Sequence, residues 1–280
     1  MTDFGVAIST TGDEHRMAFL LTAVRNWRAA VGQDAPVFVT VDGDEAASQR
    51  VADAVGGLAK VVRVGQPGPE WGNEFGVRNG RIGVAANKNT GIEALVDLVD
   101  IGLFLSDDDS SPLGPEALEL HTRTPGLHTM VCWGLSRLSV RPTGDGFAYW
   151  RWPRGVMLYV PKGLVEKYGG FREEFGPGGH EHVEYSRRLD PEMAMFRTPQ
   201  EYAHRRGQGA GQYWHAEDRP RPGEKGEALD RRRSAQTSVR HSEGDWDRIS
   251  TIMRTATGGF VPYRARENDR LEATLIEGGR

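Results

Sequence analysis

The chain has 280 residues, of which 38% are hydrophobic and 36 are glycine, nearly twice the usual glycine share of about 7%. This size and composition exclude a disordered chain and predict a large buried core, and glycine without a three-residue period excludes collagen. A formal net charge of −4 excludes an overall basic field for nucleic acid, and a single cysteine excludes an intramolecular disulfide and a cysteine-based zinc site.

Strand and helix patterns alternate through the first 106 residues. Strands are predicted over residues 4–9, 37–41, 58–64 and 101–105, and helices over 17–31, 45–55 and 85–99. Thr11-Gly12-Asp13-Glu14 has the form of a capping box that opens the first helix. Such alternation predicts a parallel sheet covered by helices, in which ligands bind beyond the carboxyl ends of the strands. We therefore expect Asp42 and Asp107–Asp109, which follow two predicted strands, to converge on one crevice.

The second half of the sequence is less regular. Strands are predicted over 129–133 and 155–160, an aromatic, basic loop over 147–154, and helices over 161–168, 180–189 and 245–256. Residues 205–241 are polar and rich in Arg, Gly and Pro, which predicts a loop or tail. Much of the glycine lies in 65–83, 163–179 and 207–211, where it predicts tight turns or close backbone approaches to a ligand.

The sequence also indicates where in the cell the protein is expected. The first residues lack a signal-peptide pattern, and no stretch approaches the ~20 apolar residues of a membrane span. The lone Cys132 lies in an apolar strand pattern and is expected to be a buried residue rather than a nucleophile. We expect a cytoplasmic protein without a membrane span.

Three adjacent aspartates, Asp107, Asp108 and Asp109, follow the fourth predicted strand. Like charges a few ångströms apart repel one another unless a cation compensates them, and Mg²⁺ or Mn²⁺ prefers such oxygen ligands together with substrate phosphates. The alternative interpretation is a solvated loop with a helix-capping aspartate, because Ser110-Ser111-Pro112 follows.

Six motifs, in this order along the chain, resemble those of GT-A glycosyltransferases, the nucleotide-sugar enzymes of family-2 type. They are Ile8-Ser9-Thr10, Val39-Thr40-Val41-Asp42, Lys88-Asn89-Thr90-Gly91-Ile92, Phe104-Leu105-Ser106-Asp107-Asp108-Asp109, Gly169-Gly170-Phe171-Arg172-Glu173-Glu174-Phe175 and Gly178-Gly179-His180-Glu181-His182-Val183-Glu184-Tyr185-Ser186-Arg187-Arg188. The last is similar to the galactosyltransferase and polypeptide N-acetylgalactosaminyltransferase branch. The resemblance covers about residues 4–215.

The resemblance implies a GT-A fold, which is a Rossmann-like αβα sandwich with a mostly parallel central sheet and an irregular C-terminal region on the acceptor side. It implies a catalytic domain over 1–215, with a nucleotide-sugar half of about 1–110 and an acceptor half of about 111–215. An Arg/Gly/Pro-rich loop and a C-terminal helix would then occupy 216–280.

For the donor, the resemblance implies a nucleoside-diphosphate sugar, which we expect to be linked to UDP, and Mn²⁺ or Mg²⁺ bridging its two phosphates. Asp109 would bind the metal, and Asp107 would contact ribose, sugar or metal. Asp108 could exchange roles with either neighbour, because the family often has Asp where Ser106 stands. Thr10, Asp42, Lys88 and Asn89 would contact the nucleotide; Asp42 as a turn or cap residue and Lys88 as a surface lysine are the alternatives.

A third metal ligand would be His204, with His215 as the alternative, and Arg205 would meet the diphosphate. A lone histidine is otherwise a surface or packing residue. Transfer with inversion needs a base for the acceptor hydroxyl, for which Glu181 and His182 are both candidates. The family usually has an acid where His182 stands, so the base stays open between the two, and capping of a helix is the alternative role. A retaining mechanism needs no such base.

The function that this resemblance implies is metal-dependent transfer of a sugar to a hydroxyl acceptor. The acceptor would be a protein, a glycan or a hydroxylated DNA base, the last kept because of Arg231-Arg232-Arg233 and disfavoured by the negative net charge. Two alternatives are a nucleotidyltransferase, which should have a basic glycine-rich loop after the first strand, and a non-catalytic module that binds nucleotides or carbohydrates.

Overall fold

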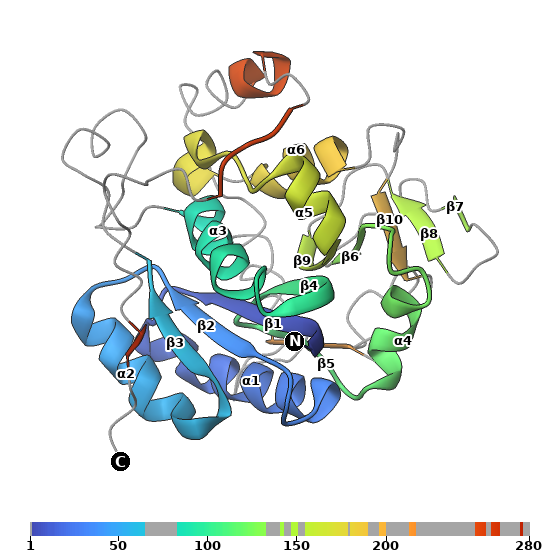
Figure 1. Ribbon diagram of the computed structural model, residues 1–280. Coiled ribbons are helices and arrows are strands. Elements are labelled where there is room, and N and C mark those ends of the chain that lie inside the picture. The colour runs from blue at the N-terminus through green and yellow to red at the C-terminus, as the bar shows by residue number, and fades with distance from the viewer. Residues whose placement is uncertain are drawn as a thin grey trace, which may run out of the picture.

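The computed structural model describes residues 2–64, 83–132, 141–142, 147–150, 155–178, 180–189, 196–199, 213–216, 250–255, 259–263 and 275–276. Among these, a seven-stranded sheet lies at the centre of the molecule (Figure 1). Its strands are β1 (Thr2–Thr10), β2 (Val37–Val41), β3 (Lys60–Arg63), β4 (Val99–Asp107), β6 (Thr129–Cys132), β9 (Gly155–Pro161) and β12 (Leu275–Ile276).

The strand order is β12-β3-β2-β1-β4-β9-β6, and the four middle strands, β3, β2, β1 and β4, run parallel. The strands β9 and β6 continue the sheet antiparallel on one side, and β12 pairs antiparallel with β3 on the other. The helix α1 (Met17–Val31) connects β1 to β2, α2 (Glu45–Val55) connects β2 to β3, and α3 (Val84–Leu95) precedes β4, as the alternating sequence pattern predicts. The predicted α/β class is confirmed.

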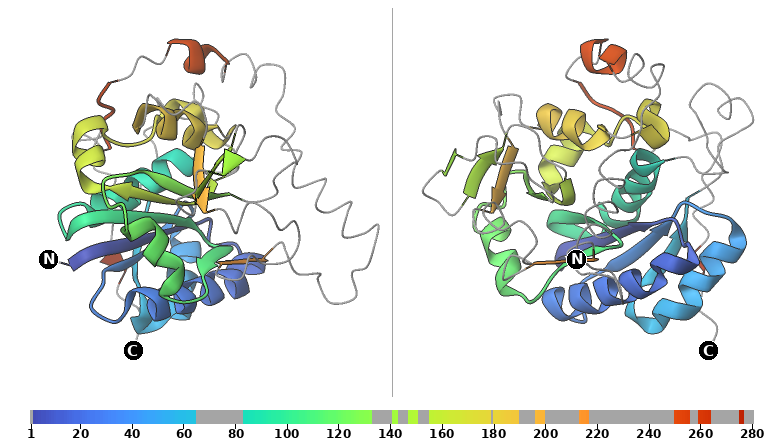
Figure 2. Two further views of the ribbon diagram at one scale, coloured as in Figure 1. Left: turned by 90° about the vertical axis from the view of Figure 1, so that its right-hand side faces the viewer. Right: turned by 180° about the vertical axis from the view of Figure 1, so that it is seen from behind.

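Helices cover both faces of the sheet, as the two further views in Figure 2 also show. On one face lie α1 (Met17–Val31), α2 (Glu45–Val55) and α4 (Glu116–Thr122), and on the other lie α3 (Val84–Leu95), α5 (Lys162–Tyr168) and α6 (Glu181–Leu189). Side chains alternate between the faces along β1: Val6 and Ile8 pack with α1, and Ala7 packs against α3. The sandwich therefore has one core on each side of the sheet.

Shorter elements complete the described residues. They are η1 (Glu14–Arg16), η2 (Gly56–Leu58), η3 (Glu173–Gly178), a small sheet of β7 (Arg141–Pro142), β8 (Phe147–Trp150) and β10 (Phe196–Pro199), and a pair of β5 (Ser110–Pro112) with β11 (Tyr213–His215). The loop predicted over 147–154 is therefore wrong for 147–150, which pair with β10 as a strand.

Two predicted details in the first hundred residues differ from the structure. The capping box does not form: Thr11 Oγ1 donates to the Asp13 carboxylate at 2.9 Å, η1 intervenes, and α1 begins only at Met17. The helix predicted over 85–99 ends at Leu95, because the chain must turn within three residues to begin β4 at Val99.

A buried polar network joins α4 to the sheet on the α1 side. Tyr213 donates its hydroxyl proton to the Ala117 carbonyl at 2.5 Å, so His121 must donate to Tyr213 from Nε2 and accept from Thr129 at Nδ1. Burial, with a smaller contribution from the charge of His128, lowers the pKa of His121 to about 3. His121 is thus a neutral core residue.

The C-terminal part of the chain returns to the sandwich. Val261 forms an isolated parallel bridge with Gly169, and Met253 and Tyr263 pack against the core on the α3 side. None of the helices in the described ranges has the length and apolar character that crossing a membrane requires.

Candidate functional site

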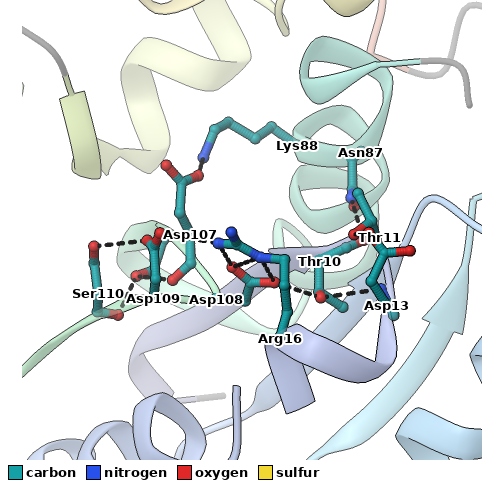
Figure 3. Close-up of polar contacts among 12 residues, drawn as sticks. Thr10, Thr11, Asp13, Arg16, Asn87, Lys88, Asp107, Asp108, Asp109 and Ser110 are labelled. Atoms are coloured by element: carbon teal, nitrogen blue, oxygen red, sulfur yellow. Dashed lines mark hydrogen bonds and ion pairs between the residues drawn. The ribbon is translucent and has the colours of Figure 1, made fainter. Parts of the chain in front are cut away.

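The carboxyl ends of β1, β2 and β4 bring together residues that are far apart in the sequence. In the β1–β4 register, Ser9 lies opposite Asp107, so Thr10 and the three aspartates meet at the same edge of the sheet (Figure 3). The Asp42 amide donates to the Thr10 carbonyl at 2.9 Å, which places the end of β2 beside them. The predicted convergence of Asp42 with Asp107–Asp109 on one edge is what the structure shows.

Asp108 is the buried member of the acidic triplet. Its carboxylate accepts a 2.6 Å hydrogen bond from Thr10 Oγ1 and is held by the guanidinium of Arg16, whose Nε lies 2.9 Å from both oxygens and whose Nη2 also contacts it. Burial raises the pKa of Asp108, and Arg16 and Thr10 oppose that rise. Asp108 is a bracing residue between the ends of β1 and β4, and its oxygens face away from solvent.

Arg16 is a site residue that the sequence patterns do not reveal. The segment after β1 reads as acidic, because Asp13 and Glu14 precede Arg16. In the structure η1 turns the Arg16 side chain back over the triplet, where Nη2 lies 2.9 Å from Asp109 Oδ2 as well as contacting Asp108. Burial alone would lower the pKa of Arg16, but the two carboxylates outweigh it and raise that pKa, so the group stays charged.

Asp109 lies at the turn that leads from β4 into β5. It accepts a 3.2 Å hydrogen bond from Ser110 Oγ, and its carbonyl accepts from the Ala216 amide at 2.8 Å. The pairing of β5 with β11 sets His215 opposite Ser110. His215, the alternative candidate for the third metal ligand, is therefore paired with the residue that follows Asp109. His204 and Arg205 lie outside the described residues.

Lys88 carries its charge from α3 into the same site. Its side chain is only 2% exposed, and Nζ lies 2.9 Å from Asp107 Oδ1, while Asp107 itself is 33% exposed. Burying an ammonium is costly unless it is paired, so the position of Lys88 is set by the carboxylates around it. The surface-lysine alternative for Lys88 is wrong.

Glu181 begins α6 and is 5% exposed, and its Oε2 has no hydrogen-bond partner among the described residues. Oε1 lies 3.4 Å from His182 Nδ1. Burial alone would raise the pKa of Glu181, but the hydrogen bond and charge of His182, with a further contribution from Lys88, hold it below its usual range. Lys88 therefore acts electrostatically on Asp107 and on Glu181, which come from the two halves of the chain.

His180 precedes α6 with φ +72°, a left-handed conformation that a residue with a Cβ rarely adopts. Its carbonyl accepts hydrogen bonds from the amides of Val183 and Glu184 and so begins the helix. The strained residue sets the direction of the first turn of α6, and with it the position of Glu181. Strain of this kind is common at functional sites.

Asn89 and Asp42 hold the backbone around the site. Asn89 Nδ2 donates to the Phe171 carbonyl and to Glu173 Oε1, both at 3.0 Å, and its Oδ1 accepts from the Phe171 amide at 2.7 Å. The buried Asp42 accepts a 2.8 Å hydrogen bond from the Gly83 amide, just before α3. Asn89 and Asp42, both predicted to contact the nucleotide, are thus hydrogen-bonded to the backbone of the protein itself.

The carboxylates at the end of β4 suit a divalent cation that binds together with a phosphate-containing substrate. No group of three or more His, Cys, Asp and Glu side chains that could hold a metal is found in the part of the chain that the structure describes. Mg²⁺ and Mn²⁺ need only one or two protein carboxylates when substrate phosphates and waters complete the shell. Asp107 and Asp109 supply those carboxylates at one strand end, so the residues present fit such an ion.

The order and direction of the strands, with helices on both faces, are those of a GT-A fold. No protein-family model and no curated protein matches the chain. Among solved structures, S. aureus TarS 1-349 in complex with UDP-GlcNAc is similar, at 12% identity and a TM-score of 0.52, over 90% of this chain and 65% of that one. The chain thus spans just under two thirds of that TarS structure.

Two weaker similarities accompany it. A second S. aureus TarS structure matches at 12% identity and a TM-score of 0.46, over 78% of this chain and 38% of that one. An active-site mutant of LgtC matches at 13% identity and a TM-score of 0.39, over 87% of this chain and 99% of that one. The fold of the chain is shown by its similarity to the first TarS structure.

Proposed function

We propose that the protein is a metal-dependent glycosyltransferase that moves a sugar from a nucleoside-diphosphate sugar, UDP-linked, to a hydroxyl group of an acceptor, with inversion. The observation that carries this proposal is the position of Lys88. Its buried ammonium lies 2.9 Å from Asp107 at the end of β4, and it adds a smaller contribution to that of His182 in lowering the pKa of Glu181 at the start of α6 against the opposing effect of burial. A donor-side carboxylate and a candidate base therefore share one cation at the edge of a GT-A sheet.

On the donor side, Lys88 would contact the diphosphate, and Thr10 and Asp42 line the neighbouring strand ends where the nucleoside would lie. Asp107 and Asp109 would hold Mn²⁺ or Mg²⁺, with His204 or His215 as the third ligand. When bound, the ion would supply positive charge to the departing diphosphate. Arg205 remains a proposed diphosphate contact outside the described residues.

On the acceptor side, Glu181 would take the proton of the attacking hydroxyl. A general base must be ionised before it can accept a proton, and the low pKa of Glu181 keeps it so at neutral pH. Its buried Oε2 has no hydrogen-bond partner among the described residues and would accept the hydrogen bond of an acceptor hydroxyl that reached it. His182, beside Oε1, is the second candidate and would hold the carboxylate in orientation.

The similar TarS structure is a complex with UDP-GlcNAc, which supports a UDP-sugar as the donor. A protein, a glycan and a hydroxylated DNA base are the proposed acceptors. The basic segment Arg231-Arg232-Arg233, which motivates the DNA base, lies outside the described residues.

The test is to incubate the protein with Mn²⁺ and a panel of nucleotide sugars and to identify the released products. We expect slow release of UDP from one UDP-sugar, accelerated by the correct acceptor. Release of pyrophosphate from a nucleoside triphosphate would instead indicate a nucleotidyltransferase. Absence of both release and nucleotide binding would overturn the proposal, and mass spectrometry of candidate acceptors then separates protein, glycan and DNA.

A further inference from the structure

The guanidinium group of Arg16 has an anchored side and an open side. Nε and Nη2 are held by Asp108 and Asp109, but Nη1 has no hydrogen bond with any residue that the structure describes. The Arg16 side chain is 27% exposed, whereas that of Asp108 is 3% exposed. A guanidinium already fixed by one anion can bind a second without the cost of ordering a long side chain.

The open side of Arg16 lies at the edge of the sheet where a ligand is expected. Arg16 follows β1 closely, and Figure 3 shows its guanidinium among Thr10, Asp107 and Asp109, with Lys88 above Asp107. Strand ends of a parallel sheet are where ligands bind in this architecture. Arg16 approaches this edge from η1, while Lys88 approaches it from α3.

A second observation at this edge also points to a ligand. Asn87 donates from Nδ2 to the Thr10 carbonyl at 3.0 Å, and its Oδ1 is buried with no hydrogen-bond partner among the described residues. A buried acceptor without a donor is unfavourable in the protein alone. A bound molecule with N–H or O–H groups at the end of β1 would satisfy it, as a nucleoside can.

The charges at the site require a cation beside the triplet if a diphosphate is to bind. Three carboxylates face the two cations Arg16 and Lys88, so this cluster alone is still negative. A diphosphate brought to uncompensated carboxylates would be repelled. Arg16 reduces that repulsion and, because guanidinium groups pair well with phosphate oxygens, offers a contact of its own.

We propose that Arg16 binds a phosphate of the nucleotide donor through Nη1 while Asp108 holds the guanidinium in place. This inference rests on the proposed function and adds one residue to its donor site. Asp108 is then a positioning residue, which explains why it is buried between β1 and β4 and leaves donor and metal contacts to Asp107 and Asp109.

The experiment measures UDP and uridine affinity by calorimetry in the presence of Mn²⁺, for the full chain and for Arg16→Gln. A lost hydrogen bond to a charged group weakens UDP binding about 10- to 100-fold, whereas uridine, which has no phosphate, should bind within about twofold of the wild type. Arg25→Gln, at an exposed arginine on α1, is the matched control and should bind both like the wild type.

Arg16→Gln leaves the buried Asp108 carboxylate without its cation, which could by itself destabilise the fold. A second variant therefore separates loss of binding from misfolding. Arg16→Gln/Asp108→Asn removes both charges, and thermal unfolding of both variants reports on the fold. Equal losses for UDP and uridine, or unchanged UDP affinity in a folded variant, would overturn the role of Arg16. Wild-type protein that binds neither UDP nor any other nucleoside diphosphate would instead overturn the proposed function itself.

Discussion

Asn89 and Phe171 exchange two hydrogen bonds, one from the side-chain amide to the Phe171 carbonyl and one from the Phe171 amide to Asn89 Oδ1. The side chain thereby acts as a short strand partner for the backbone of the Gly-Gly-Phe segment. Because Asn89 belongs to α3 and Phe171 lies just before η3, this pair holds the Gly-Gly-Phe segment against α3.

The first prediction concerns that pair. Asn89→Asp keeps the acceptor but removes the donor, so it leaves the Phe171 carbonyl unpaired and places a carboxylate against Glu173. We expect a loss of about 1–3 kcal/mol in the free energy of unfolding, measured by urea denaturation. Gln33→Glu, an amide-to-acid change at an exposed residue after α1, is the comparison variant. A stability of Asn89→Asp equal to that of the wild type would contradict the bracing role.

The second prediction tests Lys88. Lys88→Met removes the cation shared by Asp107 and Glu181, so we expect kcat/KM to fall by about 10² or more, the usual effect of losing one charge-stabilising group. The pKa of Glu181 should rise when its positive neighbour is removed, and the acid limb of the pH–rate profile should move to higher pH. Lys60→Met, at an exposed lysine that begins β3, should change neither quantity. If the acid limb of Lys88→Met stays at the wild-type pH, the charge of Lys88 does not affect the pKa of Glu181.

The third prediction separates the two candidate bases. Glu181→Gln should lower the transfer rate by about 10²–10⁴, the range for loss of a general base, while UDP affinity stays unchanged. His182→Asn should have a smaller effect, because His182 only supports Oε1 at 3.4 Å. A larger loss in His182→Asn than in Glu181→Gln, in steady-state assays of both variants, would assign the base to His182.

The fourth prediction follows from the neutral His121. Its pKa is about 3 in the folded protein and about 6.5 in the unfolded chain, so between these values the unfolded state binds more protons. This residue therefore contributes stability at neutral pH that is lost as the pH falls from about 6.5 toward 3, with a slope approaching about 1.4 kcal/mol per pH unit.

The measurement compares the free energy of unfolding at about pH 5, 6 and 7, across the range where free histidine titrates, for the wild type and His121→Gln. Glutamine retains hydrogen-bonding groups but cannot titrate, and the difference between the two proteins removes the contribution of all other groups. We expect a shallower pH dependence in the variant. Parallel curves would mean that His121 has the same pKa in the folded and unfolded states, and would contradict the lowered pKa.

The final prediction uses two glycines. A Cβ on Gly170 would lie 2.6 Å from the Tyr263 Cβ and would also overlap the Asn89 amide, so Gly170→Ala should lower the melting temperature. Gly163 is exposed on α5, and a Cβ added there would meet no other atom within 4 Å. Gly163→Ala should therefore stabilise the fold by up to about 1 kcal/mol. A melting temperature below that of the wild type in both variants would contradict this difference.

The sequence patterns predict the sheet and the carboxyl ends of its strands well. Apolar runs alternating with amphipathic helices determine β1, β2 and β4, so the meeting of Asp42 with the triplet follows from parallel register alone. Arg16 could not be found in this way, since its partners lie more than ninety residues away and its neighbours are acidic. The pairing of β5 with β11 was also missed, because three-residue strands carry no periodicity.

The short strand β12 has a consequence for how the molecule behaves in concentrated solution. Leu275 and Ile276 pair with Val62 and Val61 and so occupy the outer hydrogen-bonding edge of β3. An uncovered edge of this kind, with valines along it, is a template for pairing with other chains. Removal of the last residues would therefore expose a self-association surface, separated by β2 and β3 from the strand β1 that carries Thr10.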